Sequence, residues 1–129
     1  MKAAGTAAVG GAGDFAAGEE RDAQRPLDLV HLSRYTLGNR GLEAELLGLF
    51  RVQAELYAER LATAESDKDW KDTAHSLKGS ARGLGAWELG DLAETAEHMA
   101  SDPAARALMV AQIRSAIGAV NLFIDELMA

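Results

Sequence analysis

The chain has 129 residues, which suits one domain with a buried hydrophobic core. Hydrophobic residues make up 48% and charged residues 26%, a composition typical of globular proteins. The absence of cysteine excludes disulfides and thiolate metal sites, and the net charge of −7 argues against binding nucleic acid through a basic surface. Because no dense apolar block suggests a signal peptide or a membrane span, we expect a cytoplasmic protein.

The first part of the chain differs in composition from the rest. Residues 1–24 are rich in alanine and glycine and then in polar residues, without large apolar side chains at a regular spacing. Such a segment cannot offset its ordering entropy, so we predict a flexible leader before a helical domain over residues 25–129. Pro26 and the apolar residues after it predict a brief helix with proline in its first turn.

A long helix and then a shorter one are predicted next. Asn39 lies in a glycine-rich turn and can cap a helix that reaches about Ala64. Ser66 or Asp67 can cap the following helix, which Gly85 is placed to end. The apolar residues that recur at helical spacing in the first of these helices are Leu42, Leu46, Phe50, Tyr57 and Leu61.

Two further helices complete the domain. The fourth carries Leu89, Leu92, Ala96 and Met99, and the last begins near Pro103 with an apolar stripe from Met109 to Leu127. No segment alternates with the period of a β-strand. We therefore predict an all-α fold, an antiparallel up-down-up-down four-helix bundle with a short additional N-terminal helix, and a monomer.

One helix face combines an exposed histidine with basic residues. At about 100° per residue, His75 points roughly 140° away from the buried stripe of its helix. The same outer face carries Lys71, Lys78, Gly79 and Arg82. The stripe itself consists of Trp70, Ala74, Leu77, Ala81 and Leu84.

This face suits phosphoryl transfer. A histidine side chain is largely neutral near pH 7, and its unprotonated nitrogen can attack a phosphoryl group. Lys78, one turn along, could hold the anionic oxygens by charge-assisted hydrogen bonds. Gly79 costs a helix interior about 1 kcal/mol relative to alanine, and its missing side chain would let a partner approach. The chain has no nucleotide-binding loop or acidic metal-ligand cluster, so we expect no cofactor or metal, with Mg²⁺ only in the partner.

The segment AHSLKGSARGLGAWELGDLAETAE, residues 74–97, resembles the signature of histidine-containing phosphotransfer (HPt) domains. The elements that carry the resemblance are His75, Lys78, Gly79, Leu84-Gly85-Ala86, Leu89, Leu92 and Glu97. Ala93 departs from the family pattern, in which cysteine is frequent, at a position expected to pack in the core. The resemblance extends more loosely in helix order and length from Pro26 through the last helix.

The resemblance implies a phosphoprotein of two-component signalling that is a carrier, not an enzyme. Its phosphoacceptor would be His75, relaying phosphate between the receiver domains of hybrid histidine kinases and response regulators. Lys78 and Gly79 match the family positions that neutralise charge and admit the partner. Lys71 and Arg82 match no fixed family position, and their electrostatic role is inferred from their place on the outer face.

Three other interpretations compete with this one. A di-metal carboxylate bundle pairs Glu with Glu-x-x-His on inward faces, whereas this chain offers only the isolated Asp28-x-x-His31 and Asp72-x-x-His75. A kinase dimerisation region usually has an acidic residue after its histidine and a later proline, whereas Ser76 follows His75 here and no proline occurs between it and Pro103. We also expect no ATP-binding domain. A structural adaptor would explain the helices but not the basic face around the histidine.

The remaining histidines and tryptophans have simpler interpretations. We expect His31 and His98 to be structural or surface residues, because His31 has apolar neighbours in the short first helix and His98 follows Glu97 on a helix edge. Trp70 belongs to the buried stripe of its helix. Trp87 begins the next helix, where packing on helix ends is favoured over exposure to a partner.

Overall fold

The computed structural model describes residues 25–129, and the predicted leader over residues 1–24 lies outside them. Within this range all regular secondary structure is helical and no strand is present, so the all-α prediction is confirmed for it. The five helices are α2 (Leu29–Thr36), α3 (Arg40–Ala62), α4 (Asp67–Leu84), α5 (Trp87–Glu97) and α6 (Pro103–Met128).

Polar side chains and one glycine fix the helix ends, and the roles of Asn39, Ser66 and Gly85 agree with the prediction. The side chains of Asn39, Ser66 and Asp102 accept hydrogen bonds from backbone N–H groups in the first turns of α3, α4 and α6. Gly85 ends α4 with φ of +85°, and a Cβ added there would lie 3.0 Å from the carbonyl oxygen of Asp28. This turn therefore needs glycine for its backbone angle and for the close approach of the neighbouring segment.

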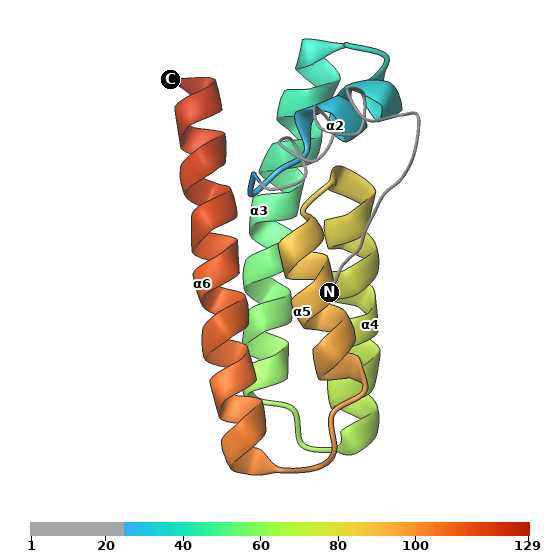
Figure 1. Cartoon of the computed structure of the whole chain (residues 1–129), viewed down its shortest axis with the longest axis vertical. Coiled ribbons are helices and arrows are strands. Elements are labelled where there is room, and N and C mark those ends of the chain that lie inside the picture. Colours follow the sequence, from blue (N-terminus) through green and yellow to red (C-terminus); the bar gives the residue numbers. More distant parts are fainter. Residues whose placement is uncertain (1–24) are drawn as a thin grey trace, which may run out of the picture.

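The four longer helices lie side by side along the longest axis of the molecule (Figure 1). The α3–α4 and α5–α6 connections lie at one end, and the α4–α5 connection lies nearer the other. Within this group each helix packs on two of the other three, α3 on α4 and α6, and α5 on α4 and α6. The apolar side chains that face inward from all four form one continuous core.

The buried face of α3 agrees with the predicted one except at Leu42. Phe50 and Leu61 are buried, and Leu46 and Tyr57 pack partly buried against the core. The prediction was wrong at Leu42, which is 39% exposed, and it omitted Leu47, Ala54 and Ala58, which are buried. Because α3 carries apolar residues around much of its circumference, spacing alone does not select every core residue. Its exposed apolar residues include Leu49, Val52 and Leu56.

The short helix α2 is held against the end of α4 by Asp28. Asp28 caps α2, its backbone N–H donates to Gly85 O at 2.9 Å, and its Oδ2 accepts from Trp87 Nε1 at 2.9 Å. His31 Nε2 lies 3.1 Å from the Gly83 carbonyl oxygen, to which it can only donate. The structural interpretation of His31 fits this contact. Pro26 precedes the cap, so its predicted place in the first turn of the helix was wrong.

The last helix is unusually apolar. Pro103–Met128 is long and apolar enough, by length and composition, to cross a membrane. Seven of its side chains are nevertheless buried in the protein core, which is also the pattern of a core helix in a soluble bundle. These buried residues are Met109, Val110, Ile113, Ala116, Ile117, Val120 and Ile124.

Candidate functional site

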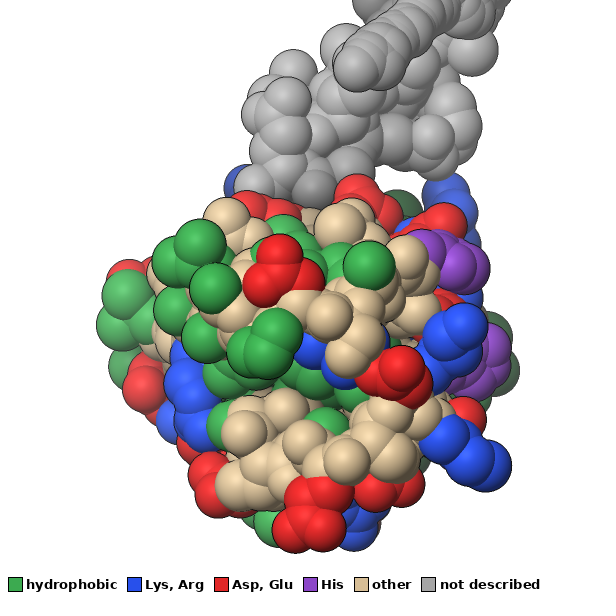
Figure 2. Space-filling view, turned by 90° about the horizontal axis from the view of Figure 1, so that it is seen from below, with side chains coloured by type: hydrophobic (Ala, Val, Ile, Leu, Met, Phe, Trp, Pro, Cys, Tyr) green, Lys and Arg blue, Asp and Glu red, His purple; other side chains and the backbone are tan. Residues whose placement is uncertain are grey.

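His75 lies on the outer face of α4. The predicted stripe of this helix, from Trp70 to Leu84, is buried against the rest of the bundle. His75 lies on the opposite side, with 67% of its side chain exposed. Figure 2, which views the molecule along the bundle, shows histidine side chains at the surface beside basic and acidic ones. The imidazole is therefore accessible to another protein.

A carboxylate from the neighbouring helix orients this imidazole. Glu97 is the last residue of α5, and its Oε2 lies 2.9 Å from His75 Nδ1. Its other oxygen, Oε1, lies 2.8 Å from Lys78 Nζ in an ion pair. The Glu97 side chain is 14% exposed and the Lys78 side chain 20% exposed. His75 and Lys78 are thus brought together, as predicted, but through a shared acidic partner.

The charge of Glu97 determines which imidazole nitrogen can react. Contact with Lys78 lowers the pKa of Glu97 below its ordinary value, partial burial opposes this effect, and contact with His75 adds to it. An ionised carboxylate only accepts hydrogen bonds, so Nδ1 of His75 carries the proton that it shares with Glu97. In the neutral imidazole the lone pair is then on Nε2, and this arrangement would allow Nε2 to act as a nucleophile.

Gly79 lies one turn beyond His75 on α4. An added Cβ would meet nothing within 4 Å, so packing inside the protein does not require glycine here. A groove of about 240 Å³ begins at Gly79 and continues between α4 and α3. It is lined by Tyr35, Leu46, Leu49, Phe50, Gln53, Gly79, Ser80, Gly83 and Leu84. The surface beside His75 is therefore open and partly apolar.

The two other predicted basic residues lie apart from this cluster. Arg82 turns toward α5, where it forms ion pairs with Asp91 and Glu94 and lowers the pKa of Glu94. A Cβ added at Gly90 would lie 2.8 Å from Arg82 Cγ, so the arginine stem packs closely on α5. Lys71 is exposed one turn before His75. The structure therefore uses Arg82 to join two helices, and it leaves Lys71 at the surface.

Glu97 is the site residue that sequence reasoning left without a role. It stood in the phosphotransfer signature, and that membership was the available signal. In residues 25–129, no group of three or more histidine, aspartate or glutamate side chains is placed to hold a metal ion. Asp28 and His31 of the di-metal interpretation instead contact the C-terminal end of α4, at the carbonyl oxygens of Gly85 and Gly83.

The fold and the site together define a helical domain that presents an oriented, solvent-accessible histidine. The family model of the Hpt domain matches residues 45–127. The chain therefore belongs to the Hpt domain family, whose members transfer phosphoryl groups through histidine in two-component signalling and interact with receiver domains. No curated protein and no solved structure matches the chain.

Proposed function

We propose that this protein relays a phosphoryl group through His75 from a receiver-domain aspartate of a hybrid histidine kinase to one of a response regulator. The observation that carries the proposal is the pairing of an exposed imidazole with a largely buried carboxylate, Glu97, 2.9 Å from Nδ1. This pairing leaves Nε2 free for attack on a partner's phosphoryl group. The protein would be a carrier, without ATP binding or turnover of its own.

The transfer step follows from these contacts. His75 Nε2 attacks the phosphorus of the partner's aspartyl phosphate, so a P–N bond forms while the P–O bond to aspartate breaks and the carboxylate leaves. Nδ1 keeps its proton throughout, and the positive charge that develops on the ring is stabilised by Glu97. The reverse reaction passes the group to the aspartate of the next receiver. Mg²⁺ would act only in the partner's site.

Lys78 would act on the phosphoryl oxygens. Lys78 lies one helical turn from His75, and 20% of its side chain is exposed. The ion pair between Lys78 Nζ and Glu97 holds the ammonium near the imidazole. When the phosphoryl group arrives, Lys78 Nζ can donate to the anionic oxygens as well as to Glu97, because an ammonium has three donors. Lys71 would contribute a weaker, screened attraction from the surface.

The receiver would dock over α4 and α3. The groove that runs from Gly79 toward Leu49 supports this placement, because it offers apolar side chains within one or two turns of the reactive histidine. We also propose that α3 to α6 form an antiparallel up-down-up-down bundle, which the packing of each helix on two others supports. A monomer in the cytoplasm would leave this docking face open to both partners.

The test is phosphotransfer from a purified, labelled receiver to the wild type, His75→Gln and His98→Gln. His98 follows Glu97 directly in the chain and provides a matched control. We expect acid-labile, base-stable label on the wild type and on His98→Gln, and none on His75→Gln. The wild type and His75→Gln should unfold at similar temperatures, because substituting an exposed side chain changes stability little. Label on His75→Gln would move the phosphoacceptor elsewhere, and label on none of them across several donors would favour an adaptor.

A further inference from the structure

Glu97 can orient His75 only if the C-terminal end of α5 is held in place. α5 has 11 residues, its N-cap residue Ala86 makes no side-chain capping bond, and its last turn contains no basic residue. Helices this short are marginal in isolation, and their ends fray without external partners. The position of Glu97 in the last turn therefore depends on contacts from other helices.

Two side chains outside α5 make those contacts. The indole N–H of Trp70, in α4, donates to the carbonyl oxygen of Ala96 at 2.6 Å. Arg106 Nη2, in α6, donates to the carbonyl oxygen of Met99 at 3.4 Å. These carbonyls lie on either side of Glu97 in the chain. The backbone that carries the glutamate is thus tied to α4 and to α6.

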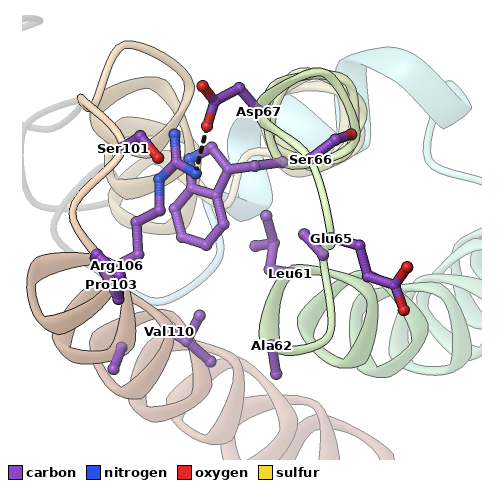
Figure 3. A pocket seen from close by; sticks show the side chains of 12 residues that line it. Leu61, Ala62, Glu65, Ser66, Asp67, Ser101, Pro103, Arg106 and Val110 are labelled. Atoms are coloured by element: carbon purple, nitrogen blue, oxygen red, sulfur yellow. Dashed lines mark hydrogen bonds and ion pairs between the residues drawn. The ribbon is translucent and has the colours of Figure 1, made fainter.

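Trp70 and Arg106 also hold each other. The Arg106 guanidinium lies 4.7 Å from the centre of the Trp70 ring, a cation–π arrangement. Arg106 Nη1 donates to Asp67 Oδ1 at 3.0 Å, so both terminal nitrogens of the guanidinium are hydrogen-bonded. Figure 3 shows the Arg106 side chain reaching from α6 to Asp67 at the start of α4. Trp70 is 2% exposed, and the pair lines a pocket of about 440 Å³ at this end of the bundle.

We propose that Trp70 and Arg106 are positioning residues for phosphotransfer, which fix the end of α5 and thereby hold Glu97 against His75. The proposal rests on the proposed function of His75. A small displacement of Glu97 would break its hydrogen bond to His75. Glu97 Oε2 lies 2.9 Å from His75 Nδ1, and lengthening this distance by about 0.6 Å would take it beyond hydrogen-bond range. Once that hydrogen bond is broken, the proton of neutral His75 is no longer directed to Nδ1, and Nε2 is less often the free nucleophile.

The two tryptophans of the chain allow a matched comparison. Trp70→Phe keeps an aromatic ring in the core and removes the N–H that donates near Glu97. Trp87→Phe removes the equivalent N–H at the opposite end of α5, where it donates to Asp28 at 2.9 Å. Both variants remove one indole hydrogen bond at an end of the same helix. Only Trp70→Phe removes the one beside the functional carboxylate.

The readout is the protonation of the His75 ring, measured by ¹⁵N NMR, together with the rate of phosphotransfer from a labelled receiver. We expect Trp70→Phe to lower the fraction of neutral His75 protonated at Nδ1 and to slow transfer about fivefold, the effect of one missing hydrogen bond. Trp87→Phe should leave both quantities at the wild-type values. The NMR measurement needs no partner, so it tests the positioning role even if phosphotransfer itself is not observed.

Arg106→Met provides a second test if Trp70→Phe does not fold. It keeps a long apolar side chain against Trp70 and removes both donors, and we expect the same direction of change at His75. An unchanged His75 tautomer in a folded Trp70→Phe or Arg106→Met variant would overturn the proposal. An equal change in Trp87→Phe would also overturn it, because the effect would then come from general loosening of α5.

Discussion

Replacing Gly79 should raise the stability of the protein and slow phosphotransfer. Gly79 lies inside α4 and has no atom within 4 Å of the position of an added Cβ. Glycine in a helix interior costs about 1 kcal/mol relative to alanine, so Gly79→Ala should raise the free energy of unfolding by about that amount. For a domain of this size the melting temperature should rise by about 4 °C.

The same change should impair transfer, and a larger side chain should impair it more. Gly79→Gln places a flexible polar chain one turn from His75, on the surface where we propose that the receiver docks. Phosphoryl transfer needs the reacting atoms about 3–3.5 Å apart, and a misplacement of about 1 Å costs roughly 100-fold in rate. We therefore expect Gly79→Gln to slow transfer roughly 100-fold and Gly79→Ala to slow it less.

Gly118 provides the control. It lies inside α6, is exposed, and also has open space where a Cβ would stand. Gly118→Ala and Gly118→Gln should stabilise the protein to the same extent as the Gly79 variants, and transfer should remain at the wild-type rate. Melting is followed by circular dichroism and transfer by the disappearance of label from a phosphorylated receiver. Wild-type transfer by Gly79→Gln would refute the reasoning about partner access.

Three further changes test the surroundings of His75 and the attachment of α2. Lys78→Met should slow transfer about tenfold, measured with a labelled receiver, because it removes one charged donor to the phosphoryl oxygens. The pKa of Glu97 is lower in the folded protein than its ordinary value of 4.5. The ionised carboxylate therefore stabilises the fold at pH values above 4.5, and this stabilisation is lost as the pH falls through the pKa of the folded state. The difference in melting temperature between wild type and Glu97→Gln should therefore be constant near neutral pH and shrink in acid; a difference that grew in acid would contradict the sign. Asp28→Ala should lower the free energy of unfolding by about 1–3 kcal/mol in urea, because it removes a helix cap and leaves Trp87 Nε1 without its acceptor; an unchanged midpoint would show that these bonds contribute little.

Arg82 shows why a helix face inferred from sequence is an incomplete guide to a site. Its angle on α4 correctly places it on the side of His75 and Lys78, but angle alone does not include the charges of the next helix. In the folded protein Asp91 and Glu94 lie within reach and draw the guanidinium toward α5. A side chain as long as arginine can turn toward nearby opposite charges, and the packing of the helices determines which charges are near.

Features that depend on local interactions could be predicted from the sequence. Asn39, Ser66 and Gly85 mark helix ends through bonds to neighbouring backbone or through a backbone angle that suits glycine. The apolar spacing of α4 likewise placed His75 outside the core, because helical geometry relates every side chain to its neighbours by a fixed rotation.

Which side chains meet at the site depends on the packing of the helices. Glu97 follows His75 by 22 positions, and it reaches Nδ1 because α5 packs back along α4. The position of that helix end depends in turn on Trp70 and Arg106, which lie in two other helices. Contacts between helices depend on how whole faces pack together, and no local spacing in the chain encodes them. The histidine could therefore be identified as a candidate site from the sequence, whereas the contact of Glu97 with its Nδ1 became apparent only in the fold.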